Sequence, residues 1–104
     1  MTLTTMTFFE RFEADILSGK KTITIRDASE KDYQPESVVQ VSTYEHNRWF
    51  CQLKIESITP IRFNDLNNFH AAQENMTLCQ LKAVIAEIYP NIDQLFVIKY
   101  SLAS

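Results

Sequence analysis

Several features common in other classes of protein are missing from this chain. No window approaches the roughly 18 consecutive apolar residues that a membrane-spanning helix needs. The first ten residues, MTLTTMTFFE, lack the cationic segment and long apolar run of a signal peptide. Cys51 and Cys79 form no CxxC motif and lie far apart in the sequence, so we expect two buried, reduced thiols rather than a disulfide. These absences predict a cytoplasmic protein without a membrane segment.

Basic residues are also scarce for a protein that binds nucleic acid through its phosphates. Thirteen Asp and Glu residues outnumber ten Lys and Arg, which gives a formal net charge of -3. Proteins that hold a nucleic-acid backbone by counterion release usually carry a basic surface, and the only dense basic run here is Lys20-Lys21. Non-specific binding to RNA is therefore disfavoured, whereas a small neutral ligand or a single nucleoside is compatible with this charge.

Histidine and cysteine form no metal-binding pattern. His46 falls in an expected turn and His70 on an expected helix, and neither has a cysteine or carboxylate at ligand spacing. We therefore expect no metal site and no cofactor.

What the chain does contain is typical of one globular domain. Of its 104 residues, 45% are hydrophobic and 22% are charged, which suffices for a core and a solvated surface. No internal repeat, low-complexity tract or linker divides it. The prediction is a single domain over residues 1–104.

Helix and strand signals alternate along the chain. Thr7 with Glu10 has the form of a capping box, and apolar residues then recur at helical spacing up to Gly19. Thr77 with Gln80 is a second such box. The full prediction, in chain order, is a helix ending at Gly19, strands over 22–26, 38–44 and 49–58, a short helix capped by Asn64 or Asp65, a helix from Thr77 to Pro90, and a strand over 94–102.

The same periodicities predict which faces are buried. Pro60 is expected to end the third strand, and Tyr44 and Phe50 are expected to be packing residues rather than a base-stacking platform. With so few strands and no repeating strand–helix–strand units, we expect an α+β domain around a small, largely antiparallel sheet or barrel. The residues expected on the buried faces of the third strand and the short helix are Trp49, Cys51, Leu53, Ile55, Leu66 and Phe69.

A four-residue motif surrounds the single glycine of the chain. Gly19, Lys21, Thr24 and Arg26 spell G-x-K-x-x-T-x-R, which resembles the signature of the ASCH domain family. The stretches TFFERFEADILSGKKTITIRD and HAAQENMTLCQLKAVIAEIYP resemble those of short bacterial ASCH proteins that are N(4)-acetylcytidine amidohydrolases, in which threonine replaces the acidic residue of many other members. The resemblance covers nearly the whole chain. It implies an α+β, PUA-like fold, a small mixed β-barrel with flanking helices, and a nucleoside substrate.

The resemblance also implies the roles of individual residues: Thr24 as nucleophile, Lys21 as base and Glu74 as proton donor. A threonine hydroxyl needs a base, and a lysine serves as one only when neutral, a state that burial near other cations favours. Glu74 is expected at the end of the short helix, where the backbone disfavours a carboxylate. Arg26 is assigned to substrate binding, with stabilisation of the acyl oxygen or pairing with a nearby acid as alternatives.

Strand geometry raises one difficulty for this assignment. In a flat strand Lys21 and Thr24 have opposite parity, so they meet only if the strand begins after Lys21 or is bulged there. Gly19 is expected to end the helix and to let the backbone turn, so that Lys21 approaches Thr24.

Simpler interpretations of the same residues are also open. Lys20 and Lys21 fit solvated charges near a helix end, Thr24 fits an ordinary strand residue, and Glu74 fits a helix surface. Two other functions compete with the enzyme: a non-catalytic ASCH module that binds RNA or a modified base through Lys21 and Arg26, and a small interaction domain. The acidic balance and the threonine at position 24 favour the enzyme.

Overall fold

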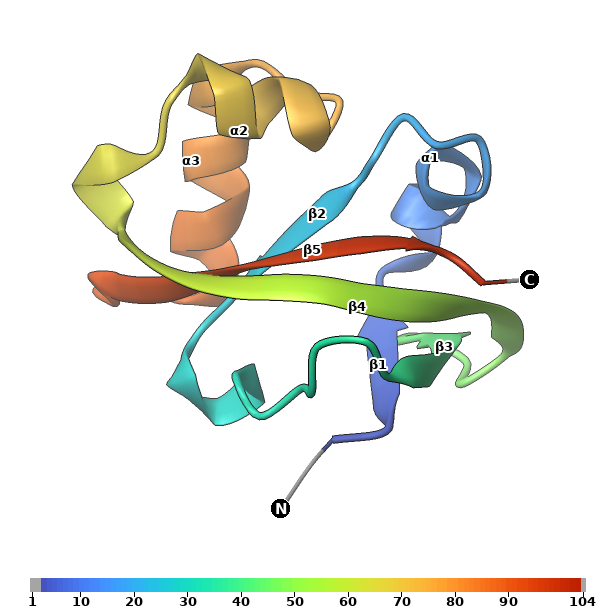
Figure 1. Ribbon diagram of the computed structural model, residues 1–104. Coiled ribbons are helices and arrows are strands. Elements are labelled where there is room, and N and C mark those ends of the chain that lie inside the picture. The colour runs from blue at the N-terminus through green and yellow to red at the C-terminus, as the bar shows by residue number, and fades with distance from the viewer. Residues whose placement is uncertain (1–2, 104) are drawn as a thin grey trace.

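The computed structural model describes residues 3–103, which form an α+β arrangement (Figure 1). The elements follow in the order β1 (Thr5–Phe8), η1 (Glu10–Phe12), α1 (Glu13–Leu17), β2 (Ile23–Arg26), η2 (Ala28–Glu30), β3 (Val38–Thr43), β4 (Trp49–Arg62), η3 (Phe63–Asp65), α2 (Asn68–Gln73), α3 (Leu78–Ile88) and β5 (Gln94–Leu102). No helix within residues 3–103 is long and apolar enough to cross a membrane.

The five strands form one mixed sheet in the order β1-β3-β4-β5-β2. The β1–β3 pair is parallel and the other pairs are antiparallel. No pairing joins β1 to β2 within the described part of the chain, so the sheet is not closed into a barrel. The α+β class with flanking helices is confirmed.

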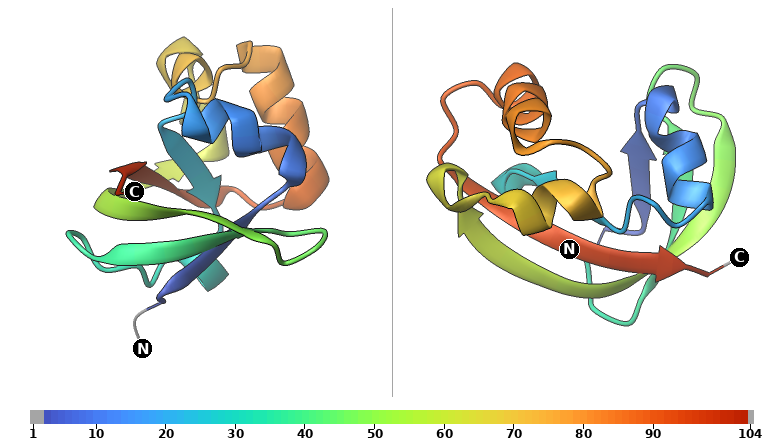
Figure 2. Two further views of the ribbon diagram at one scale, coloured as in Figure 1. Left: turned by 90° about the vertical axis from the view of Figure 1, so that its right-hand side faces the viewer. Right: turned by 90° about the horizontal axis from the view of Figure 1, so that it is seen from above.

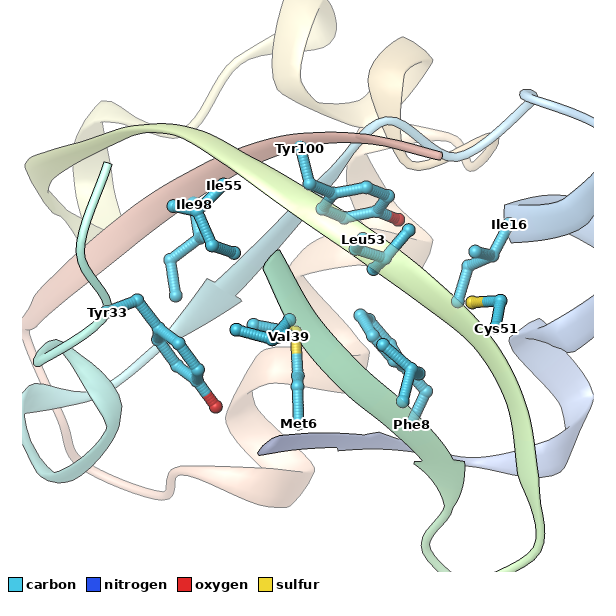
Figure 3. Packing of buried hydrophobic residues seen from close by; sticks show 11 residues of the cluster. Met6, Phe8, Ile16, Tyr33, Val39, Cys51, Leu53, Ile55, Ile98 and Tyr100 are labelled. Carbon is cyan, nitrogen blue, oxygen red and sulfur yellow. The ribbon is translucent and has the colours of Figure 1, made fainter. Parts of the chain in front are cut away.

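The long strand β4 divides the interior into two apolar clusters. Its first part pairs with β3 and its second part with β5. The cluster around β1, β3 and β4 includes Met6, Phe8 and Tyr100 (Figure 3). The rings of Phe8 and Tyr100 meet edge to face, with their centroids 6.0 Å apart. The second cluster lies between the sheet and the helices α2 and α3. In Figure 1, β2 lies between α3 and the η1–α1 segment, and the view from above in Figure 2 shows α3 and α1 on the same side of β5.

The predicted first helix begins too early. Thr7 and Phe8 belong to β1, whose parallel pairing with β3 buries Met6 and Phe8 at two-residue spacing. The Thr7–Glu10 capping box is therefore wrong, because a pairing distant in sequence decides the conformation here. The rest of that segment does form a helix, α1, which is followed by Gly19 with a φ of 80°.

The third predicted strand ends later than expected. β4 continues through Pro60, which pairs with Phe96 of β5. Proline lacks a backbone N–H, but β3 pairs with β4 only as far as Lys54, so no strand on the β3 side of Pro60 requires that donor. Trp49 is 53% exposed rather than buried. The register between β3 and β4 shifts at Val41, and the shift turns Trp49 out of the buried face.

The helical half is partly as predicted. The cap of α2 is Asn67, later than expected, so Leu66 is buried before the helix begins whereas Phe69 is 69% exposed. The Thr77–Gln80 capping box of α3 is confirmed, and the helix ends before Pro90. The bounds of β5 are those predicted. Both cysteines are free thiols, Cys51 buried as expected and Cys79 exposed.

Candidate active site

Gly19 determines where the chain goes after α1. Its amide donates to the Ile16 carbonyl at 3.2 Å, and the Lys20 amide donates to the Asp15 carbonyl at 2.9 Å. These two bonds, with the left-handed backbone at Gly19, form the Schellman motif that ends many helices. The Lys21 amide also donates to the Asp15 carbonyl, at 3.0 Å, so Lys21 stays with the helix end.

Lys21 therefore lies outside the strand register, and the parity difficulty does not arise. β2 begins only at Ile23. The Lys21 side chain turns inward, is 3% exposed, and donates from Nζ to the Ile23 carbonyl at 2.9 Å. The Tyr100 hydroxyl, on the neighbouring strand β5, donates to the Lys21 carbonyl at 3.0 Å and so holds the backbone at Lys21.

Lys21 forms an ion pair with Glu74, 53 residues away in sequence. The Thr22 amide donates to the Gln73 carbonyl at 2.8 Å, and this bond fastens the entry of β2 to the end of α2. Glu74 is the C-cap residue of α2 and is 5% exposed. One backbone contact thus brings the two side chains together away from water.

Burial dominates the electrostatics of Lys21. It holds the pKa of Lys21 well below its usual value, since an ammonium without water is disfavoured. The charge of Arg26 lowers the pKa further, and that of Asp15 raises it. The Lys21 Nζ lies 5.1 Å from the centroid of the Phe12 ring, which helps to exclude water.

A second pair, Thr24 and Arg26, lies on the face of β2 opposite Ile23 and Ile25. Arg26 Nε donates to Thr24 Oγ1 at 2.9 Å, and both residues are buried. The guanidinium also donates to Glu30 Oε2 at 2.6 Å and to the Thr7 carbonyl at 2.8 Å. Arg26 is thereby fixed at three points and holds the Thr24 hydroxyl in one orientation.

Both pairs line one cavity of about 210 Å³. Within residues 3–103, no hydrogen bond links Lys21 or Glu74 directly to Thr24 or Arg26. The structure therefore brings the four predicted site residues to one cavity as two separate pairs. The other walls are aliphatic and aromatic side chains, among them Phe9, Phe12, Tyr44, Met76, Leu81, Val84, Ile85 and Ile88.

Some expectations about single residues are wrong and some residues were missed. Lys20 is exposed as the solvated interpretation requires, but Lys21 and Glu74 are buried. Tyr44 is 67% exposed rather than packed. Glu30 was missed, although its position four residues after Arg26 is a recognisable ion-pair spacing.

The histidines take local structural roles. His70 Nδ1 accepts from the Asn67 amide at 3.3 Å in the cap of α2, and burial lowers the pKa of His70. His46 lies 3.8 Å from Glu10 at the surface. No group of three or more His, Cys, Asp or Glu side chains suited to a metal ion occurs in the described residues 3–103.

The arrangement of strands and helices recurs in solved structures. An ASCH domain from Lactobacillus crispatus JV V101 matches 97% of this chain and 80% of its own, with a TM-score of 0.77 and 14% identity. ASCH from Zymomonas mobilis matches 94% of this chain and 68% of its own, with a TM-score of 0.74 and 13% identity. At such identities the likeness defines the fold, that of the ASCH domain.

Sequence comparison identifies the family. The model of the ASCH domain matches residues 4–80, and the chain belongs to the ASCH domain family. A relative from Vibrio vulnificus is 71% identical over 97 residues, 93% of each chain. One from Shewanella baltica is 53% identical over 104 residues, 100% of this chain and 99% of its own. Both relatives are named N(4)-acetylcytidine amidohydrolase, so the resemblance noted in the sequence is confirmed.

Proposed function

We propose that this protein is an amidohydrolase that converts N(4)-acetylcytidine and water into cytidine and acetate. The observation that carries the proposal is the buried Lys21–Glu74 pair, which shares one cavity with the Thr24 hydroxyl. The names of the relatives support the substrate. A cytoplasmic location is part of the proposal and rests on the sequence.

The Lys21–Glu74 pair shares one proton, and with that proton on Glu74 the pair offers both a base, the Lys21 amine, and an acid, the Glu74 carboxyl group. Between an ammonium with a carboxylate and an amine with a carboxylic acid, burial favours the uncharged combination, because each ion would lose its hydration. The lowered pKa of Lys21 is consistent with the amine. In this state Lys21 is ready to accept a proton and Glu74 is ready to give one.

Thr24 is the nucleophile in the proposed first step. Its Oγ1 attacks the acetyl carbon while its proton passes to Lys21 Nζ, which exchanges its bond to the Ile23 carbonyl for one to Thr24. Such catalytic hydrogen bonds often form only once substrate is bound. Glu74 gives its proton to the exocyclic nitrogen as the carbon–nitrogen bond breaks, and cytidine leaves.

Water completes the reaction. Glu74, now a carboxylate, and the protonated Lys21 together hold the proton gained from Thr24. The Glu74 carboxylate takes a proton from a water molecule that attacks the acetyl-threonine ester, and the protonated Lys21 gives its proton to Thr24 Oγ1 as the ester bond breaks. Acetic acid leaves and ionises to acetate in solution, and the Thr24 hydroxyl, the Lys21 amine and the Glu74 carboxylic acid are restored.

Arg26 has a narrower role here than substrate binding. Its Nε already donates to Thr24 Oγ1, so it stabilises negative charge that develops on this oxygen when the proton leaves. Its other contacts, to Glu30 and Thr7, keep the guanidinium from moving toward a ligand. Arg26 is therefore proposed to orient and activate the nucleophile.

The test is to incubate purified protein with N(4)-acetylcytidine and to measure cytidine and acetate, which should appear in equal amounts. Lys21→Ala should abolish release, whereas Lys20→Ala removes the exposed neighbouring lysine and should not. No release by the wild type would refute the proposal. Tight RNA binding in its place would favour the non-catalytic module, which is less well supported because Lys21 and Arg26 are each paired with a carboxylate.

A further inference from the structure

Two aromatic rings at the cavity have no part in the steps proposed above. Phe9 and Tyr44 meet edge to face, with centroids 5.3 Å apart and an interplanar angle of 65°. Both line the cavity, yet Tyr44 is 67% exposed. Since Tyr44 is largely uncovered by the protein, most of its surface remains available to a ligand.

Hydrogen bonds fix the backbone segments that carry these two rings. The Tyr44 amide donates to the Phe8 carbonyl at 2.8 Å, and the Glu10 amide donates to Glu45 Oε1 at 2.9 Å. Together they fasten the turn after β3 to the junction between β1 and η1, where Phe9 lies. A surface that is already ordered loses little conformational freedom when a ligand binds.

The Arg11 guanidinium makes cation–π contacts with Phe9 and with the neighbouring Phe12. The Arg11 guanidinium carbon lies 5.3 Å from the Phe9 centroid and 4.9 Å from the Phe12 centroid. Phe9 and Phe12 are themselves 6.4 Å apart. Phe9 is thus supported by Arg11 and Phe12 as well as by Tyr44.

We infer that Phe9 and Tyr44 form a stacking platform for the pyrimidine ring of the substrate, with Tyr44 as its main contact. The inference rests on the proposed function, because it concerns the same cavity. In N(4)-acetylcytidine the amide nitrogen is bonded directly to the ring. When the acetyl carbon reaches Thr24, the ring must therefore occupy the adjoining part of the cavity.

The two walls of the cavity carry different kinds of side chain, and this difference assigns the pyrimidine ring to the wall with Phe9 and Tyr44. The wall from α3 includes the aliphatic side chains of Leu81, Val84 and Ile85, and the Tyr89 ring at the end of this helix is packed against the apolar cluster under α3. The wall from β1, η1 and the turn after β3 carries Phe9 and Tyr44. Figure 1 shows α3 and the η1–α1 segment on opposite sides of β2. A planar base stacks on aromatic rings, whereas the methyl of the acetyl group needs only an apolar surface.

Stacking of this kind acts on binding more than on the chemical step. The ring face contacts Tyr44 equally before and during reaction, so loss of the contact should raise KM and leave kcat nearly unchanged. Because cytidine carries the same ring, its inhibition constant should rise by the same factor as KM.

The experiment compares Tyr44→Leu, Tyr44→Phe and the wild type with N(4)-acetylcytidine as substrate. Tyr44→Leu keeps an apolar side chain without a ring, and we expect KM and the cytidine inhibition constant to rise about 5- to 30-fold. Tyr44→Phe restores the ring and should recover most of that loss. Trp49→Leu is the matched control, since Trp49 is also an exposed aromatic but does not line the cavity.

The outcomes separate this inference from the proposed function. If the wild type releases cytidine and Tyr44→Leu leaves both constants unchanged, the platform is refuted and the activity stands. A fall in kcat with unchanged KM would also refute it. If the wild type releases no cytidine, calorimetric titration with cytidine decides: binding that Tyr44→Leu weakens by a similar factor supports the platform, and absent or unaltered binding overturns it.

Discussion

Replacing Glu74 with glutamine tests how the proton is shared between Lys21 and Glu74. In the wild type the buried pair holds one proton, and near neutral pH the unfolded chain also holds one on these two side chains, as a lysine ammonium. Folding therefore moves no proton at this site. In Glu74→Gln the buried Lys21 gives up its proton on folding, because burial holds its pKa well below the ordinary 10.5.

The sign of the resulting pH dependence follows from proton linkage. Between the lowered pKa and 10.5, the unfolded variant binds more protons than the folded one, so stability rises with pH and falls as the pH decreases through this window. The slope approaches about 1.4 kcal/mol for each pH unit. Above pH 10.5, the ordinary pKa of lysine, Lys21 is neutral in both states and contributes no further dependence of stability on pH.

Urea denaturation across a pH series measures this slope as the difference between variant and wild type, so most other titrations cancel. The double variant Lys21→Met/Glu74→Gln should lose this slope, because the lysine that gives up the proton is absent, and Lys20→Met should match the wild type. A loss of about 3–5 kcal/mol in Glu74→Gln that is independent of pH would show instead that Lys21 stays charged.

Four further predictions concern activity and stability. Lys21→Arg should be nearly as inactive as Lys21→Ala in cytidine release, because a guanidinium does not deprotonate, and Thr24→Ser should keep some of the activity that Thr24→Val loses. Arg26→Lys should lower kcat more than it raises KM, because one ammonium cannot hold Thr7, Thr24 and Glu30 together; an unchanged kcat would contradict this. Turnover should survive exhaustive chelation, because the acidic side chains of the cavity, Glu30 and Glu74, are already paired with Arg26 and Lys21; loss of activity that zinc restores would contradict this. Gly19→Ala should cost about 1 kcal/mol in urea denaturation, from the left-handed φ alone, since an added Cβ meets no atom within 4 Å; a much larger loss would contradict this.

Sequence reasoning succeeded where all the signals for an element lie within it. α3 carries its own capping box at Thr77 and Gln80 and a proline just beyond its end, so its bounds could be predicted. β1 could not be identified in this way. Its four residues form a strand because β3 offers a parallel edge more than thirty residues later, and the nearby phenylalanines imitate a helix.

The same distinction applies to the candidate site. Lys21, Thr24 and Arg26 come from one short segment, and the motif brought them to attention together. Glu74 entered only through the family resemblance, because the Thr22–Gln73 contact that brings it to Lys21 joins distant segments. The exposure of Tyr44 was missed for a similar reason: it depends on how the turn after β3 meets the end of β1.

The single glycine connects these levels. Its left-handed backbone ends α1 within one residue, and Lys21 consequently leaves the helix before β2 begins. Had the strand started at Lys21, its side chain would share a face with Ile23, which packs in the apolar cluster under α3 and does not line the cavity. Because it starts two residues later, Lys21 reaches the cavity that Thr24 also lines. A helix cap is thus the local feature that brings Lys21 and Thr24, the proposed base and nucleophile, to one cavity although they lie three residues apart.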